Sequence, residues 1–172
     1  MKNLILIRHA KSSWDMPSTD KERQLCKRGV NDAHRMAEVI NEYLPKTFII
    51  WSSTAQRAKS TAYIFTENLA IPSESIIFKD ELYTFEVAEL EKCIRGCDNI
   101  YDSLIIFGHN DAITDFVNTF GNIAVKKIPT AGFVSLQFNA NSWKDIAGGK
   151  TLKLLFPRDV KQHECNTSKQ VY

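Results

Sequence analysis

The stretch Leu4-Ile5-Leu6-Ile7-Arg8-His9-Ala10 decides the fold class of this chain. Its four consecutive apolar residues lack the polar alternation of a half-exposed strand, and such runs are typical of strands buried on both faces. Three further apolar runs, at residues 48–51, 76–78 and 104–107, have the same character. Strands of this kind favour a mostly parallel sheet that carries helices on both faces.

Segments with a helical spacing of apolar residues lie between these runs. They occupy residues 29–44, the stretch from the cap candidates Ser52-Ser53-Thr54 to Leu69, residues 85–95, and the stretch from the cap candidate Asn110 to Gly121. Near the end of the chain, apolar and polar residues alternate at 134–138 and again at 152–156, which predicts an antiparallel hairpin at the sheet edge. The fold predicted is a three-layer α/β/α sandwich with a mostly parallel central sheet.

The composition indicates one domain of ordinary size. The chain has 172 residues, of which 44% are hydrophobic, and 22 basic residues face 20 acidic ones. We expect a single domain over residues 1–157 and a polar C-terminal tail over residues 158–172. The net charge of +2 is too small to indicate a nucleic-acid partner.

Targeting signals are also missing from the pattern. No apolar run approaches the roughly 20 residues that span a bilayer. The run at residues 4–7 stops at Arg8, short of the roughly 7–15 residues of a signal-peptide core. We therefore expect a cytoplasmic protein that does not bind a membrane.

The residues that follow the predicted strands point to a phosphate site. Arg8 and His9 follow the first strand, Arg57 lies one turn into the helix after the second, and His109 follows the strand at 104–107. Ligands of open α/β sheets bind beyond the carboxyl ends of the strands, so these side chains are expected to meet at one edge. Guanidinium groups match the oxygens of a phosphate, and helix N-termini there add partial positive charge.

The two histidines indicate chemistry beyond binding. A histidine among cations has its neutral form favoured, and a neutral imidazole can attack phosphorus as a nucleophile. Arg8 and Arg57 at the same edge would repel a metal ion, so no metal site is expected. A serine hydrolase is not indicated either, because the sequence has no Gly-x-Ser-x-Gly elbow.

Three motifs in this order resemble the histidine phosphatase superfamily, and its short phosphohistidine phosphatase (SixA-like) branch in particular. They are Arg8-His9-Ala10-Lys11, Ser52 through Ala58 and Gly108-His109-Asn110. The segment Asp20 through Gly29 and the C-terminal hairpin with Trp143 also resemble that branch. The resemblance covers about residues 2–157 and implies a phosphoglycerate-mutase-like fold.

The same resemblance implies a role for each matching residue. His9 would accept the phosphoryl group, Arg8 and Arg57 would hold the phosphate oxygens, and His109 would hydrogen-bond the transferring group. No metal or organic cofactor is implied. The implied function is a metal-independent phosphatase that hydrolyses phosphohistidine on proteins through a phosphohistidine enzyme intermediate.

The general acid is a weaker match. Glu81 fits the family's position for an acid after the third strand, with Asp80 and Glu86 nearby. A phosphoramidate leaving group needs less help from an acid than an alkoxide, so a missing acid would favour phosphohistidine over phosphoesters. Ala10 replaces the common glycine of the first motif, and Asp15 stands where larger members have a phosphate-binding asparagine, so Asp15 is not expected to be a ligand.

Two alternatives to a phosphoprotein phosphatase stay open. Only about twenty-five residues separate the strands at 76–78 and 104–107, too few for the helical cap of larger relatives, so an open pocket is expected that can receive a phosphorylated protein. A small phosphoester remains possible, as does a non-catalytic phosphate-binding module, which would need neither histidine. Lys11 and Ser12 can be phosphate contacts or ordinary loop residues. Arg23 and Arg28 can line the approach for an acidic or phosphorylated partner, but a solvated basic loop is the favoured interpretation.

Overall fold

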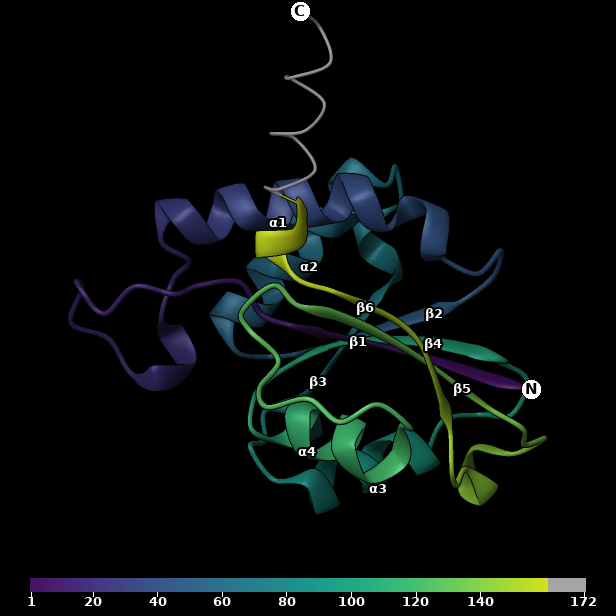
Figure 1. Ribbon diagram of the computed structural model, residues 1–172. Helices are drawn as coiled ribbons and strands as arrows, with labels where there is room; N and C mark the ends of the chain where they lie inside the picture. The colour runs from purple at the N-terminus through teal and green to yellow at the C-terminus, as the bar shows by residue number, and fades with distance from the viewer. Residues whose placement is uncertain (161–172) are drawn as a thin grey trace, which may run out of the picture.

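The computed structural model describes residues 1–160 and has a six-stranded sheet at its centre (Figure 1). The strands are β1 (Lys2–Arg8), β2 (Ile49–Ser53), β3 (Ile76–Lys79), β4 (Ser103–Gly108), β5 (Phe133–Phe138) and β6 (Lys150–Leu155). Their order is β3-β2-β4-β1-β5-β6. The first four strands along the chain are parallel, while β5 runs antiparallel to β1 and β6 antiparallel to β5. The predicted fold class and edge hairpin are confirmed.

Helices cover both faces of the sheet. They are α1 (Lys27–Ile40), α2 (Gln56–Asn68), α3 (Val87–Arg95) and α4 (Ala112–Phe120). Figure 1 shows α1 and α2 on one face and α3 and α4 on the other. The chain thus forms the three layers predicted from the alternation of buried strands and helices.

The apolar run of β1 serves both layers of the core. Leu4 and Leu6 pack among residues of α3 and α4, whereas Ile5 and Ile7 pack among residues of α1 and α2. Successive side chains of a strand point to opposite faces, so a strand with helices on both sides needs apolar residues at every position. All four side chains are at most 2% exposed, and burying each one stabilises the fold by about 1.5–3 kcal/mol.

Two helix starts differ from the prediction. The N-cap of α2 is Ala55 and has no side-chain cap, because the Ser53 hydroxyl instead accepts a hydrogen bond from the Ala55 amide at 3.2 Å. The N-cap of α4 is Asp111 rather than Asn110, whose side-chain oxygen accepts from the Thr114 amide one turn further on. Both polar side chains thus bond to backbone amides, but as turn residues rather than as caps.

The end of the described chain folds onto the domain. Val160 is buried in the core beneath α1 and α2. Residues 161–172, most of the expected tail over 158–172, lie outside the described residues. Within residues 1–160, no helix has both the length and the apolar character needed to cross a membrane.

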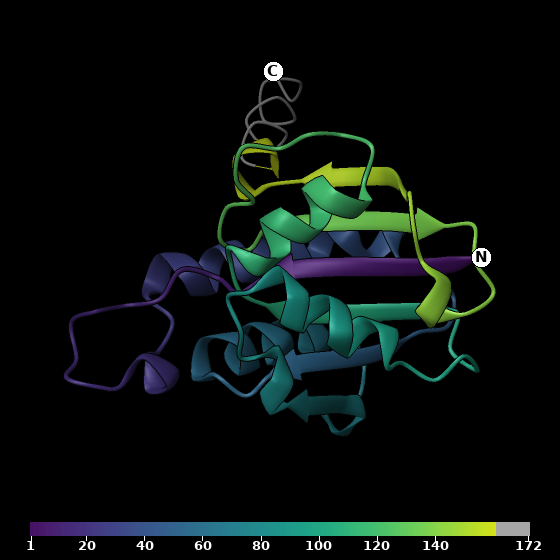
Figure 2. The same ribbon diagram turned by 90° about the horizontal axis from the view of Figure 1, so that it is seen from below.

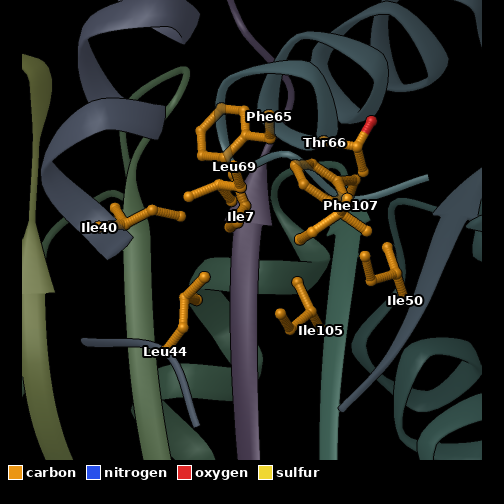
Figure 3. Close-up of a pocket in the computed structure, with 10 residues that line it drawn as sticks. Ile7, Ile40, Leu44, Ile50, Phe65, Thr66, Leu69, Ile105 and Phe107 are labelled. Carbon is orange, nitrogen blue, oxygen red and sulfur yellow. The ribbon is translucent and has the colours of Figure 1, made fainter. Parts of the chain in front are cut away.

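A small cavity lies in the core between the sheet and α1 and α2. Figure 3 shows it lined by apolar side chains from both layers, among them Ile7, Phe65 and Phe107. Its volume is about 10 Å³, close to that of one water molecule, and its lining offers almost no polar group. We therefore interpret this cavity as a packing gap and look for the functional site among the polar residues that follow the strands.

Candidate active site

The carboxyl ends of β1, β2 and β4 meet at one edge of the sheet. Arg8 lies opposite Gly108 in the parallel register, and the His9 amide donates to the Gly108 carbonyl at 3.0 Å. The centres of the His9 and His109 rings are 5.2 Å apart. Figure 2 shows the loop between β1 and α1 extending from this edge, beyond the ends of β1 and β2. The predicted convergence of strand ends is therefore what the structure contains.

His9 is held in one orientation by the backbone of the next residue. Its Nδ1 atom lies 2.7 Å from the Ala10 carbonyl oxygen, which can only accept, so Nδ1 carries the hydrogen and Nε2 keeps its lone pair. Burial is the main cause that lowers the pKa of His9 to about 3; the Arg57 and Arg8 charges add to it against the opposing effect of the Ala10 carbonyl. At neutral pH, His9 is therefore a neutral imidazole whose Nε2 atom carries no hydrogen and keeps its electron pair.

His109 is more deeply buried. It is 1% exposed, and its Nε2 atom lies 2.8 Å from the Ser53 hydroxyl. Burial, followed by the charges of His9 and Arg57, lowers its pKa to about 2. Its Nδ1 atom is buried without a hydrogen-bond partner, and so is Nε of Arg8. Buried polar atoms normally have partners, so these two atoms at one edge indicate that a bound group completes the site.

Two arginines frame the histidines. Arg57 is 1% exposed, and its Nε atom donates to Nε2 of His9 at 3.3 Å. Arg8 donates from Nη1 to the Ile128 carbonyl at 2.9 Å, which fixes the position of its guanidinium. The four residues predicted for phosphate chemistry are thus brought together, with two cations beside the neutral rings of His9 and His109.

Asp20 belongs to this cluster, although the sequence did not single it out as a site residue. Its carboxylate accepts from Nη2 of Arg57 at 3.0 Å, from Arg23 and from the Tyr83 hydroxyl. Burial alone would raise the pKa of Asp20, but the hydrogen bonds from Tyr83 and Arg57 outweigh it and lower the pKa to about 2. The only sequence signal was the resemblance of the segment that begins at Asp20.

The burial of Arg23 differs from the sequence prediction. Arg23 was expected to be solvated, yet it is only 9% exposed, because the loop folds back on itself through a bridge between Ser12 and Leu25. Arg23 donates to the Ser12 hydroxyl at 2.6 Å and stacks on the exposed Trp14 ring at 3.6 Å. Arg28 is exposed, as predicted, and Lys11 is exposed as well.

Two aromatic residues that the sequence did not indicate border His109. The ring centres of Tyr83 and Phe85 both lie 5.5 Å from that of His109, in edge-to-face arrangements. They follow the short 3-10 turn η4 (Asp80–Leu82) after β3. No pattern in the sequence marks these two residues, because their contact with His109 depends on how this turn is placed.

The structure does not bring Glu81 to the histidines. Its side chain is exposed and lines a hollow beside α3 with Trp51, Lys79 and Lys92. The turn that buries Leu82 in the core directs Glu81 to this side. Asp80 instead faces the loops at the edge, where it accepts from Thr54 at 2.6 Å and from Lys21 at 3.3 Å.

No three histidine, cysteine, aspartate or glutamate side chains within residues 1–160 gather into a candidate metal site. The Asp20 carboxylate at this edge is paired with Arg57, and the remaining groups there, the arginines and the neutral histidines, suit an anion.

Comparison with known proteins identifies the class. Residues 4–93, more than half of the chain, match the model of the histidine phosphatase superfamily (branch 1). An uncharacterized chloroplastic protein of Arabidopsis thaliana is 25% identical over 155 residues, which cover 84% of this chain and 70% of that protein. The chain therefore belongs to the histidine phosphatase superfamily and is a phosphatase.

Solved structures share the fold. SixA from Agrobacterium tumefaciens is 23% identical, with a TM-score of 0.73, over 90% of this chain and 97% of that one. The protein histidine phosphatase SixA in complex with tungstate is 18% identical, with a TM-score of 0.77, over 92% and 99% of the two chains. The SixA-like fold implied by the sequence motifs is confirmed.

Proposed function

We propose that this phosphatase removes phosphoryl groups from phosphohistidine on proteins, with His9 as the nucleophile. The observation that carries the proposal is the state of His9: a neutral ring with its lone pair at Nε2, 3.3 Å from Nε of Arg57. A phosphate that replaces this hydrogen bond would meet the His9 nitrogen at phosphorus and the Arg57 guanidinium at its oxygens. Arg8, with its unpaired Nε, would hold a second oxygen.

The reaction has two displacements at phosphorus. In the first, Nε2 of His9 forms a bond to phosphorus while the bond to the substrate nitrogen breaks, and its electron pair stays on the leaving imidazole. In the second, a water oxygen bonds to phosphorus, the pair of the P–Nε2 bond returns to His9, and the water proton passes to phosphate or solvent. Arg8, Arg57 and His109 would stabilise the charge on the transferring oxygens in both steps.

The side chains at the edge support an N–P substrate over an O–P ester. Glu81 lies away from the histidines, and the low pKa of Asp20 leaves its carboxylate without a proton at neutral pH. An alkoxide leaving group would need a proton donor. A phosphohistidine ring that already carries a proton on its other nitrogen leaves as neutral imidazole and needs none.

The connection between β3 and β4 supports a protein substrate. It contains η4 and the nine-residue helix α3, which packs against the sheet face rather than over the site. SixA, whose solved structure has the same fold, is named a protein histidine phosphatase. A side chain on a protein surface could therefore approach His9 directly.

A paired hydrolysis assay tests the proposal. Wild type, His9→Ala and the control His34→Ala, which removes a histidine that pairs with Asn68 on the outer helices, are compared in excess chelator. The substrates are a phosphohistidine-bearing protein and p-nitrophenyl phosphate. We expect chelator-resistant turnover of the phosphoprotein, unchanged in His34→Ala and lost by about a thousandfold or more in His9→Ala.

The other outcomes are also decisive. Turnover of the aryl ester alone would make the chain a phosphomonoesterase. Binding of phosphate without turnover of either substrate would make it a binding module. Turnover that survives in His9→Ala would rule out the mechanism.

A further inference from the structure

An aromatic shelf borders the second histidine. We use this name for Tyr83 and Phe85, whose ring centres lie 5.7 Å apart and each lie 5.5 Å from the centre of His109. His109 in turn lies 5.2 Å from His9. The shelf therefore borders His109 on the edge where His9 would accept the phosphoryl group from the substrate.

Phe85 is partly open to solvent, unlike the phenylalanines of the core. Its side chain is 46% exposed, although it makes two edge-to-face ring contacts. Ligand pockets are lined mainly by hydrophobic and aromatic side chains around a few polar groups, and the Phe85 ring lies beside the polar groups of this edge. Tyr83 is only partly exposed and contacts the Phe85 ring edge to face.

The shelf is held in place from several sides. The Tyr83 hydroxyl donates to the Asp20 carboxylate, and the Tyr83 amide donates to the Asp80 carbonyl at 3.0 Å. Nζ of Lys21 lies 5.6 Å from the centre of the Tyr83 ring. These contacts come from the loop after β1 and from the turn after β3, so the ring of Tyr83 has little freedom to move away from His109.

We propose that Tyr83 and Phe85 form the leaving-group subsite and that they select a planar aromatic leaving group, the imidazole of a phosphohistidine, over a non-aromatic amine. This inference rests on the proposed function. Aromatic rings attract one another edge to face or offset, beyond the effect of buried area, so the shelf adds affinity for an imidazole ring. A leaving group without a ring gains nothing from it.

The shelf has no part in the covalent step. The electron pair of the breaking N–P bond goes to the ring nitrogen, and the ring departs with the proton it already carries. Phe85 acts by holding that ring so that the N–P bond lies in line with Nε2 of His9. Its removal should therefore change the choice between leaving groups and leave the attack of His9 on phosphorus possible.

Phe85→Leu is the variant that separates these effects. It keeps an apolar side chain at an exposed position, whereas a change at Tyr83 would also release Asp20. Tyr63→Leu is the matched control, because Tyr63 is 44% exposed and makes an edge contact with Phe78 on the other side of β3. Phe85→Tyr is the conservative variant: it keeps the aromatic ring and should therefore keep the preference for an aromatic leaving group.

The experiment compares kcat/KM for phosphohistidine with that for phosphoramidate, whose N–P bond releases ammonia. We expect the ratio of the two values to fall about fivefold in Phe85→Leu, and to stay within twofold of wild type in Phe85→Tyr and Tyr63→Leu. An equal fall for both substrates, or no fall, would overturn the inference while leaving the proposed function standing. If wild type hydrolyses neither N–P substrate, the proposed function fails and the inference with it.

Discussion

Nη2 of Arg57 lies 3.0 Å from Oδ2 of Asp20, and this ion pair joins the first turn of α2 to the loop after β1. Nη1 of the same guanidinium donates to the Asp20 carbonyl. Arg57 is therefore held on its outer side by Asp20 while its Nε points at His9. Asp20 acts as a positioning residue for the arginine that would bind phosphate.

Removing the Asp20 carboxylate should make the Arg57 guanidinium more mobile but leave it in the site. We expect Asp20→Ala to lower kcat/KM for phosphohistidine by about 10- to 100-fold, because small displacements of positioning groups have effects of this size. The loss should appear in kcat as well as KM, since Arg57 would stabilise charge in the transition state. Tighter binding of inorganic phosphate with an unchanged kcat would show instead that Asp20 only competes with the ligand.

The buried histidines make the stability of the fold depend on pH. The native pKa values of His9 and His109 are about 3 and about 2, below the ordinary value of 6.5. Between these values the unfolded chain binds protons that the native chain does not, so the free energy of unfolding falls as the pH decreases below 6.5. Each histidine contributes up to about 1.4 kcal/mol per pH unit.

Denaturant unfolding at several pH values between 4.5 and 6.5 measures this slope. The lowered pKa of Asp20 acts only below its ordinary value of 3.8, so it does not interfere in that window. We expect a smaller slope in His109→Gln, whose amide cannot titrate. An equal slope in wild type and His109→Gln would contradict the assignment of His109 as a buried neutral ring.

Glu81 should be dispensable for catalysis. Its exposed side chain lines the hollow beside Trp51 and Lys92, apart from both histidines. We therefore expect Glu81→Gln to change kcat and KM for phosphohistidine by less than twofold. A fall in kcat of tenfold or more, together with the loss of the alkaline limb of the pH profile, would restore Glu81 as the general acid.

The sequence predicted the site residues that directly follow the strands of the sheet. The apolar runs located β1, β2 and β4, and parallel strands share one carboxyl edge, so Arg8, His9 and His109 had to meet there. Such a prediction needs only the order of elements along the chain and the rule for open α/β sheets.

The positions of residues in loops and turns could not be predicted in the same way. Asp20 meets Arg57 across 37 residues and Tyr83 across 63, and neither contact follows from any periodicity. The same loop folding buried Arg23, which its polar neighbours had indicated as solvated. Glu81 matched a family position, but one turn of 3-10 helix decides which of three consecutive side chains faces the site.

Gly29 allows the helix α1 to pack closely against the start of the loop that carries Asp20. A Cβ atom at this position in α1 would lie 2.1 Å from the Lys11 carbonyl oxygen, which also accepts from the Cys26 amide. Backbone atoms cannot yield as the end of a side chain can, so Gly29→Ala must push the loop away from the helix. We expect it to lower the free energy of unfolding by about 1–3 kcal/mol.

Gly96→Ala is the matched control, because a Cβ atom there would lie no closer than 3.4 Å to its neighbours and φ is −81°. Its effect should stay below about 1 kcal/mol, as for substitutions that meet no clash. Gly29→Ala should also weaken turnover of phosphohistidine, since displacing the loop moves Asp20 and with it Arg57. Denaturant unfolding and kcat/KM for both variants check this, and equal losses in the two would show that the loop does not depend on Gly29.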